Sequence, residues 1–174
     1  MRTLLFFIVL SLTACTATET RRSTGTVVDD ATTITRIKAA LLKNPVTDGL
    51  DIEVRGYKGR IQLNGFADSS EEVAEAGRIT SAIRGVSNLA NNLQIVPTSR
   101  RVGEYIDDKV LFTRLNAALA RDRAVSNLQV DVEVNRGTVL LGGFVDNREE
   151  KEAAEAAARR VSGVLELKSF IEIR

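Results

Sequence analysis

Two pairs of carboxylates have the residue types and the spacing that acid–base catalysis would need. Asp68 with Glu71, and Asp146 with Glu149, stand three residues apart in front of segments rich in Ala and Glu. An N-cap side chain and its capping-box partner have the same spacing at the start of a helix. A catalytic pair or a calcium site would need further oxygen ligands, and the EF-hand pattern is absent from the sequence. We therefore interpret these residues as helix caps.

The chain contains no histidine, which excludes the commonest general base, the Ser-His-Asp triad and every His-based zinc site. The sequence also lacks the dinucleotide-binding glycine motif and the P-loop motif. The glycines favour structural roles instead. Gly59 and Gly137 suit hairpin turns, and Gly85 and Gly163 suit left-handed caps just after a helix. We expect no catalytic residue, no cofactor and no metal, and hence no enzyme.

The single cysteine has a sequence context that predicts lipidation. An apolar run, Leu4–Leu10, is far shorter than the roughly 20 residues of a membrane-spanning helix and is typical of a signal peptide. It is followed by Leu12-Thr13-Ala14-Cys15, which resembles the bacterial lipobox. We predict a signal peptide over 1–14 and acyl chains, palmitate among them, on Cys15. Thr16 in place of Asp favours the outer membrane, with the chain facing the periplasm. The lipidated Cys and a polar tether occupy 15–28.

The remainder of the chain is a tandem duplication. Residues Asp29–Val96 align without a gap with Asp107–Arg174, and the agreement is strongest between 59–72 and 137–150. A unit of this length is long enough to bury a modest core of its own. We predict a first domain over 29–96, a linker over 97–104 and a second domain over 105–174.

Both copies have the same order of hydrophobic patterns, which predicts helix, strand, strand, helix, strand. In the first copy we expect these elements at 29–43, 50–54, 61–66, 69–84 and 89–96. In the second copy we expect them at 106–121, 128–132, 139–144, 147–162 and 165–173. The residues expected on the core face of the first helices are Ile34, Ile37 and Leu41, and Phe112, Leu115 and Leu119. The fold class is α+β, with a three-stranded mixed sheet covered by two helices in each domain.

This order of elements resembles the BON domain. The resemblance rests on Gly65-Phe66 and Gly143-Phe144 at the end of the hairpin, and on Gly85-Val86 and Gly163-Val164 after the second helix. Small residues on the second helix and asparagines in the final strand add to it. The asparagines at Asn91 and Asn92 correspond to Ser169 and Phe170, so the last strand of the second copy has diverged.

With the lipobox, two such domains resemble the dual-BON outer-membrane lipoproteins, which also have a soluble periplasmic relative. The resemblance implies attachment to phospholipid surfaces and support of envelope integrity. Envelope assembly proteins or peptidoglycan are further partners that such a protein could have. The alternative function is a periplasmic chaperone or adaptor that binds outer-membrane protein clients or cell-wall components.

Charge excludes nucleic acid as a partner. The first repeat has eight basic and nine acidic residues and the second has eleven and twelve, so neither copy is a cationic domain. Aromatic residues are also too few to form a base-stacking platform.

The first helices of the two copies differ on the side away from the core. Ile106 and Val110 lie beside Arg114 and Arg121, whereas the first copy has Val28, Thr32, Arg36 and Lys43 at these positions. Apolar side chains flanked by cations suit the surface of an anionic membrane, where each basic residue contributes about 1 kcal/mol. We predict that these four residues of the second copy bind phospholipid. The alternative is a solvated helix face, or one covered by the other domain.

Overall fold

The computed structural model describes residues 24–174 except 49, 97–101, 123–124 and 126–129. The signal peptide and Cys15 therefore lie outside the described residues, as do most of the tether and the linker. For 24–28 and 102–106 the backbone is described but the side chains are not. We call 24–96 domain 1 and 102–174 domain 2.

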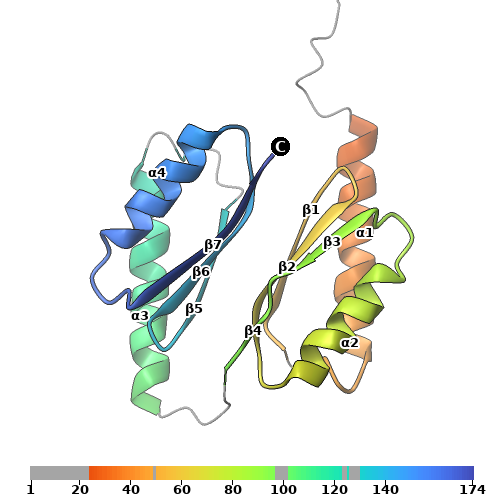
Figure 1. The fold of residues 1–174 in the computed structure, drawn as a ribbon, viewed down its shortest axis with the longest axis horizontal. Helices are drawn as coiled ribbons and strands as arrows, with labels where there is room; N and C mark the ends of the chain where they lie inside the picture. Colours follow the sequence, from red (N-terminus) through yellow and green to blue (C-terminus); the bar gives the residue numbers. More distant parts are fainter. Residues whose placement is uncertain (1–23, 49, 97–101, 123–124, 126–129) are drawn as a thin grey trace, which may run out of the picture.

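Each domain has the expected order of elements (Figure 1). Domain 1 contains α1 (Thr24–Lys43), β1 (Ile52–Tyr57), β2 (Arg60–Ala67), α2 (Ser70–Ser81), β3 (Asn88–Asn91) and β4 (Gln94–Ile95). Domain 2 contains α3 (Val102–Arg121), β5 (Val130–Asn135), β6 (Thr138–Val145), α4 (Arg148–Arg159) and β7 (Glu166–Ile173). The boundaries differ from expectation, most at the first helices, because α1 starts inside the predicted tether and α3 inside the predicted linker. Strands β1 and β5 begin two residues and end three residues later than predicted, and α2 and α4 end three residues earlier.

Both sheets are mixed. In domain 1, β1 is antiparallel to β2, and β2 is parallel to β3 and β4; in domain 2, β5 is antiparallel to β6, which is parallel to β7. The hairpins close through two residues with positive φ, Lys58 (51°) with Gly59 (77°) and Arg136 (50°) with Gly137 (74°). Such turns match the twist of the adjoining strands, and the hairpin role predicted for the two glycines is confirmed.

The last strand of domain 1 is not continuous, in contrast to the prediction for 89–96. It is interrupted between β3 and β4, where the Asn91 side chain donates to the Val73 carbonyl oxygen of α2 over 2.8 Å. The Asn92 side chain donates to Asn64 Oδ1 over 3.0 Å. These side-chain bonds compete with the regular strand geometry. The side chains of Ser169 and Phe170 form no such hydrogen bond with described residues, and β7 runs unbroken.

The helix caps are one residue away from their predicted positions. The N-caps are Ser69 and Asn147, whose side chains accept from the backbone N–H groups of Glu72 and Glu150. Asp68 and Asp146 contribute only backbone N–H groups, which donate to those two glutamates over 2.7 and 2.8 Å. With Asp68 and Asp146 as N-caps, each helix would begin at the next residue, but both helices begin one residue later than that. Glu71 and Glu149 are exposed in the first turn of their helices.

The glycines after these helices are not caps either. The C-caps are Ala82 and Arg160, both with right-handed helical backbone. Gly85 and Gly163 follow three residues later and do have positive φ, 107° and 106°. They reverse the chain into the last strand rather than end the helix.

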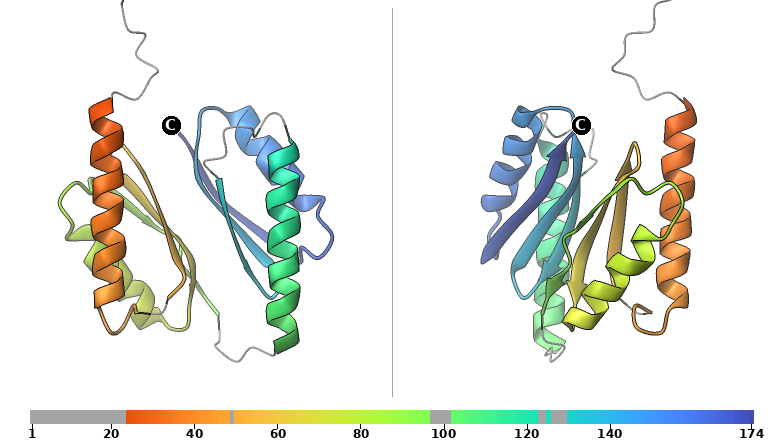
Figure 2. Two further views of the ribbon diagram at one scale, coloured as in Figure 1. Left: turned by 180° about the vertical axis from the view of Figure 1, so that it is seen from behind. Right: turned by 45° about the vertical axis from the view of Figure 1, so that its right-hand side comes forward.

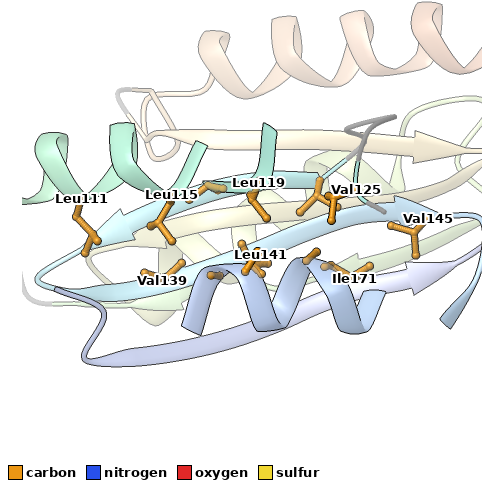
Figure 3. Packing of buried hydrophobic residues seen from close by; sticks show 13 residues of the cluster. Leu111, Leu115, Leu119, Val125, Val139, Leu141, Val145 and Ile171 are labelled. Carbon is orange, nitrogen blue, oxygen red and sulfur yellow. The ribbon is translucent and has the colours of Figure 1, made fainter. Parts of the chain in front are cut away.

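Each domain has its own hydrophobic core between its helices and one face of its sheet, and both cores lie within the described residues. The core of domain 2 is shown in Figure 3. Ile37 and Leu41 of α1, and Leu115 and Leu119 of α3, are buried as predicted. Phe112 is not, because 41% of it is exposed.

The place predicted for Phe112 is taken by the preceding residue, Leu111, which is 5% exposed. Helix α3 therefore turns the row Leu111, Leu115 and Leu119, spaced four residues apart, toward the sheet. The corresponding residue of Phe112 in α1, Ile34, is only partly buried.

The second faces of the two sheets meet each other. Figures 1 and 2 show the sheets apposed at the centre of the molecule, with α1 and α2 outside one sheet and α3 and α4 outside the other. Gln62, which is fully buried, accepts from the backbone N–H of Gly143 over 2.8 Å and donates to the Phe170 carbonyl oxygen over 3.0 Å. Arg55 forms an ion pair with Asp131. The two domains thus form one four-layered α/β/β/α body.

Candidate membrane-binding surface

A buried aspartate fixes the hairpin turn of each domain against the first helix. In domain 2, Asp108 of α3 is 6% exposed and accepts from the backbone N–H groups of Arg136 (2.9 Å) and Gly137 (3.1 Å). In domain 1, Asp30 accepts in the same way from Lys58 (2.8 Å) and Gly59 (3.0 Å). Two N–H donors compensate a carboxylate for its removal from water. Helix and turn are therefore held at a fixed distance, and a hollow lies beside them.

The hollow of domain 2 has a volume of about 500 Å³. It lies between α3, the β5–β6 turn and the segment that joins α4 to β7. Its lining consists of Asp107, Asp108, Val110, Leu111, Arg114, Arg136, Gly137, Ser162, Gly163 and Leu165. Val110 is 43% exposed and Leu165 is 83% exposed. We define the α3 surface as these two apolar residues together with Arg114 and Arg136.

The absence of a side chain at Gly137 leaves space for Leu165 at this position. A Cβ atom at Gly137 would lie 2.8 Å from Leu165 Cγ, so a larger residue in the turn would displace the leucine. The positive φ of Gly137 also disfavours other residues there. The turn therefore sets both the shape of the hollow and the exposure of its largest apolar side chain.

The structure brings together two of the four residues predicted to bind phospholipid. Val110 and Arg114 both line the hollow. Arg121 is exposed in the last turn of α3, about 10 Å along the helix axis from Arg114, and does not line it. Ile106 belongs to α3, but its side chain lies outside the described residues.

Sequence reasoning missed Leu165 and Arg136, although a signal for the leucine was present. The position of Leu165 is occupied by Ser87 in the first copy, just as that of Val110 is occupied by Thr32. Extending the comparison of the copies beyond the first helices would have found this second exchange of a hydroxyl residue for an apolar one.

The corresponding hollow of domain 1 has a volume of about 660 Å³ and a different chemistry. It is lined by Asp29, Asp30, Thr32, Thr33, Arg36, Lys58, Gly59, Arg84, Gly85 and Ser87. Neither Val110 nor Leu165 has an apolar counterpart there. The same backbone frame therefore carries two exposed apolar side chains in domain 2 where domain 1 has hydroxyl side chains.

A separate group of charges lies where β1 and β5 meet at the domain interface. Burial, and to a smaller extent the negative charges of Asp51, Glu53 and Asp131, raise the pKa of Glu133 to about 8 against the opposing effect of Lys109. On the opposite side, the hydrogen bond to Asp131 raises the pKa of Arg55. We therefore expect this part of the interface to depend on the protonation of Glu133.

The acidic residues of the described part of the chain do not form a metal site. No group of three Asp, Glu, His or Cys residues able to hold a metal ion is found there. Asp68, Glu71, Asp146 and Glu149 are exposed and do not line either hollow. Among the described residues, no helix has both the length and the apolar character to span a bilayer.

The fold and the two hollows define a class: a tandem α+β protein whose copies share one scaffold and differ in surface chemistry. The family can be stated as well. The chain belongs to the BON domain family, whose sequence model matches residues 29–97 and 107–174. The resemblance inferred from the sequence and the predicted fold class are both confirmed.

Several curated relatives are similar over most of the chain. Osmotically-inducible protein Y of Escherichia coli (strain K12) is 28% identical over 86% of this chain and 75% of the relative. Outer membrane lipoprotein DolP of Haemophilus influenzae is 27% identical over 82% of this chain and 74% of the relative. The 21 kDa hemolysin of Actinobacillus pleuropneumoniae is 29% identical over 82% of this chain and 73% of the relative.

Proposed function

We propose that the chain is a non-enzymatic, lipid-anchored periplasmic module that binds anionic phospholipid through the α3 surface and supports the integrity of the outer membrane. The observation that carries this proposal is the exposure of Val110 and Leu165 next to Arg114 and Arg136. The similarity to a protein named as an outer membrane lipoprotein supports attachment to the envelope through Cys15. The similarity to an osmotically inducible protein is consistent with a role in envelope stress.

The physical basis is an interfacial contact rather than insertion across the bilayer. Apolar side chains favour the boundary between head groups and acyl chains, and each cation near an anionic surface contributes about 1 kcal/mol. Asp107 and Asp108 also line the hollow, which offsets part of the attraction of the two arginines. The apolar side chains are therefore essential to this proposal. An acyl anchor on Cys15 would keep the domain near the membrane, so a weak contact suffices.

Vesicle sedimentation tests the contact directly. The chain from Thr16 onward retains both cores but lacks Cys15, and we expect it to sediment with vesicles in proportion to their phosphatidylglycerol content. Val110→Glu with Arg114→Glu should weaken binding at least about tenfold, or 1.4 kcal/mol. Ala39→Glu with Lys43→Glu, at exposed positions of α1 outside the hollow of domain 1, is the control and should bind like wild type.

Equal binding by wild type and by the Val110→Glu, Arg114→Glu variant would reject the α3 surface. Adding unfolded outer-membrane protein to the same assay distinguishes membrane binding from the alternative function, a chaperone or adaptor. Retention of such a client in preference to anionic vesicles would favour the chaperone or adaptor. In cells, we expect the double variant of the full lipoprotein to leave the outer membrane more permeable to detergent than wild type does.

A further inference from the structure

The hollow of domain 1 has the dimensions of a site for a small molecule. Its volume of about 660 Å³ falls within the range of about 300–1,000 Å³ that is typical of ligand pockets. It lies between α1, the β1–β2 turn and the segment that joins α2 to β3. This is the opposite domain from the α3 surface, so a ligand here would be independent of the membrane contact proposed above.

Three cations from three different segments surround this hollow. Arg36 comes from α1, Lys58 from the hairpin turn and Arg84 from the segment after α2. Within the described part of the chain, no carboxylate forms an ion pair with any of them. Of the two acidic residues in the lining, Asp30 is already engaged by two backbone N–H groups. The two arginines therefore remain available to an anion, and Lys58 Nζ, 5.5 Å from the centre of the Tyr57 ring, keeps its N–H donors for one as well.

The floor of the hollow carries hydroxyl groups that two glycines leave uncovered. Thr33 is 5% exposed, and no described residue bonds its hydroxyl. A Cβ atom at Gly85 would lie against Thr33 Oγ1, and a Cβ atom at Gly59 would lie 2.8 Å from Ser87 Oγ. Both glycines have positive φ, so the local backbone itself disfavours the side chains that would fill this space.

We propose that the hollow of domain 1 binds a phosphomonoester group. Such a group carries close to two negative charges and three terminal acceptor oxygens. The guanidinium groups of Arg36 and Arg84 suit bidentate contacts, the Lys58 ammonium acts as a point charge, and the Thr33 hydroxyl donates from the floor. A carboxylate is a poorer match, because it has only two oxygens, both in one plane, whereas the donors converge from three segments.

Two sources could supply this group: a soluble phosphorylated sugar and the phosphorylated head group of a lipid. Titration of the ¹⁵N-labelled chain from Thr16 onward with glucose 1-phosphate tests the first source, with glucose as the uncharged control. Vesicles of phosphatidylcholine with and without phosphatidic acid test the second. We expect saturable shifts of the Gly59, Gly85 and Ser87 amide signals with the phosphorylated probe and none with glucose.

Variants identify the groups responsible. Arg36→Gln with Arg84→Gln should raise the Kd for the phosphorylated probe at least tenfold, whereas Arg148→Gln, at an exposed position of α4 outside both hollows, should leave it unchanged. Thr33→Val replaces the hydroxyl by a methyl group and should also weaken binding. A thermal melt checks that the fold of this variant is intact. Loss of phosphatidic acid binding in the Arg36, Arg84 variant, without any response to glucose 1-phosphate, would assign the lipid source.

The proposal is overturned if neither probe binds, or if the Arg36, Arg84 variant binds both as wild type does. Its failure is distinct from failure of the membrane surface, because Val110→Glu with Arg114→Glu leaves this hollow untouched.

Discussion

The two sheet faces that meet at the centre of the molecule come from duplicated strands, yet they differ at the positions that touch. Gln62 and Asn64 on β2 correspond to Leu140 and Gly142 on β6. All four residues are buried. One face projects polar side chains, whereas the other offers an apolar side chain and a glycine.

These differences are complementary. A Cβ atom at Gly142 would collide with the side chain of Asn64, so the glycine of one copy makes room for the asparagine of the other. The Gln62 side chain satisfies the backbone N–H of Gly143 beside it. After duplication, each sheet thus became specific for its partner and not for a copy of itself. The interface is asymmetric, and each domain covers the face that the other would expose to solvent.

The largest effect is expected when the two faces are made alike. Gly142→Asn places on β6 the residue that β2 has at the matching position, and the new side chain must overlap with Asn64. Overpacking of a filled interior costs about 1–3 kcal/mol. We expect urea unfolding to show a loss of this size, together with separate unfolding of the two domains.

Exchanging the residues provides the control. In Asn64→Gly with Gly142→Asn, the glycine and the asparagine change sides, so the overlap is removed. We expect this double variant to regain at least half of the stability lost by the single variant. Wild-type stability of Gly142→Asn alone would show that the faces do not fit as closely as the structure indicates.

The copies also differ at one pair of matching positions that carry opposite charges, Arg55 on β1 and Glu133 on β5. We expect an effect of intermediate size on stability there. Burial and the neighbouring carboxylates raise the pKa of Glu133 from 4.5 to about 8, so the folded chain keeps a proton that the unfolded chain has lost in this pH range. Stability should therefore be highest below about pH 4.5 with respect to this group, and should fall as the pH rises through about 8.

Glu133→Gln replaces the carboxyl by a neutral amide and should remove this part of the pH dependence. In thermal melts we expect the variant to equal wild type near pH 5 and to exceed it near pH 9. Glu166→Gln, at an exposed position of β7, serves as the control and should retain the wild-type profile. A wild-type profile for Glu133→Gln would mean that the carboxyl is ionised in the folded chain.

Residues on which the two copies agree made much of the fold predictable. The positive-φ glycines of both hairpin turns, and the periodic Ile37, Leu41, Leu115 and Leu119, fix the order of the elements and one face of each core. The errors were local. Whether Leu111 or Phe112 faces the core depends on how α3 is oriented about its own axis. Two apolar residues in succession fit either orientation, so the sequence pattern does not decide between them.

The contacts between copies could not be predicted in the same way. Asn64 and Gly142 are far apart in sequence, and neither shows by its type that the other will oppose it. The candidate surface was predicted in part because Val110 and Arg114 share one helix, so helical periodicity relates them. Leu165 and Arg136 reach the same hollow through tertiary packing, which periodicity does not describe.

The smallest effects are expected at positions where the two copies agree. They test whether the copies share the same scaffold. Ser69 and Asn147 perform the same N-cap role, each accepting from the backbone N–H of a glutamate three residues on, over 3.2 and 2.8 Å. Loss of an N-cap costs about 0.5–2 kcal/mol. We expect Ser69→Ala and Asn147→Ala to lower the free energy of unfolding by similar amounts in urea titrations. A cost in one domain and none in the other would show that the copies differ in their scaffold as well as in their surfaces.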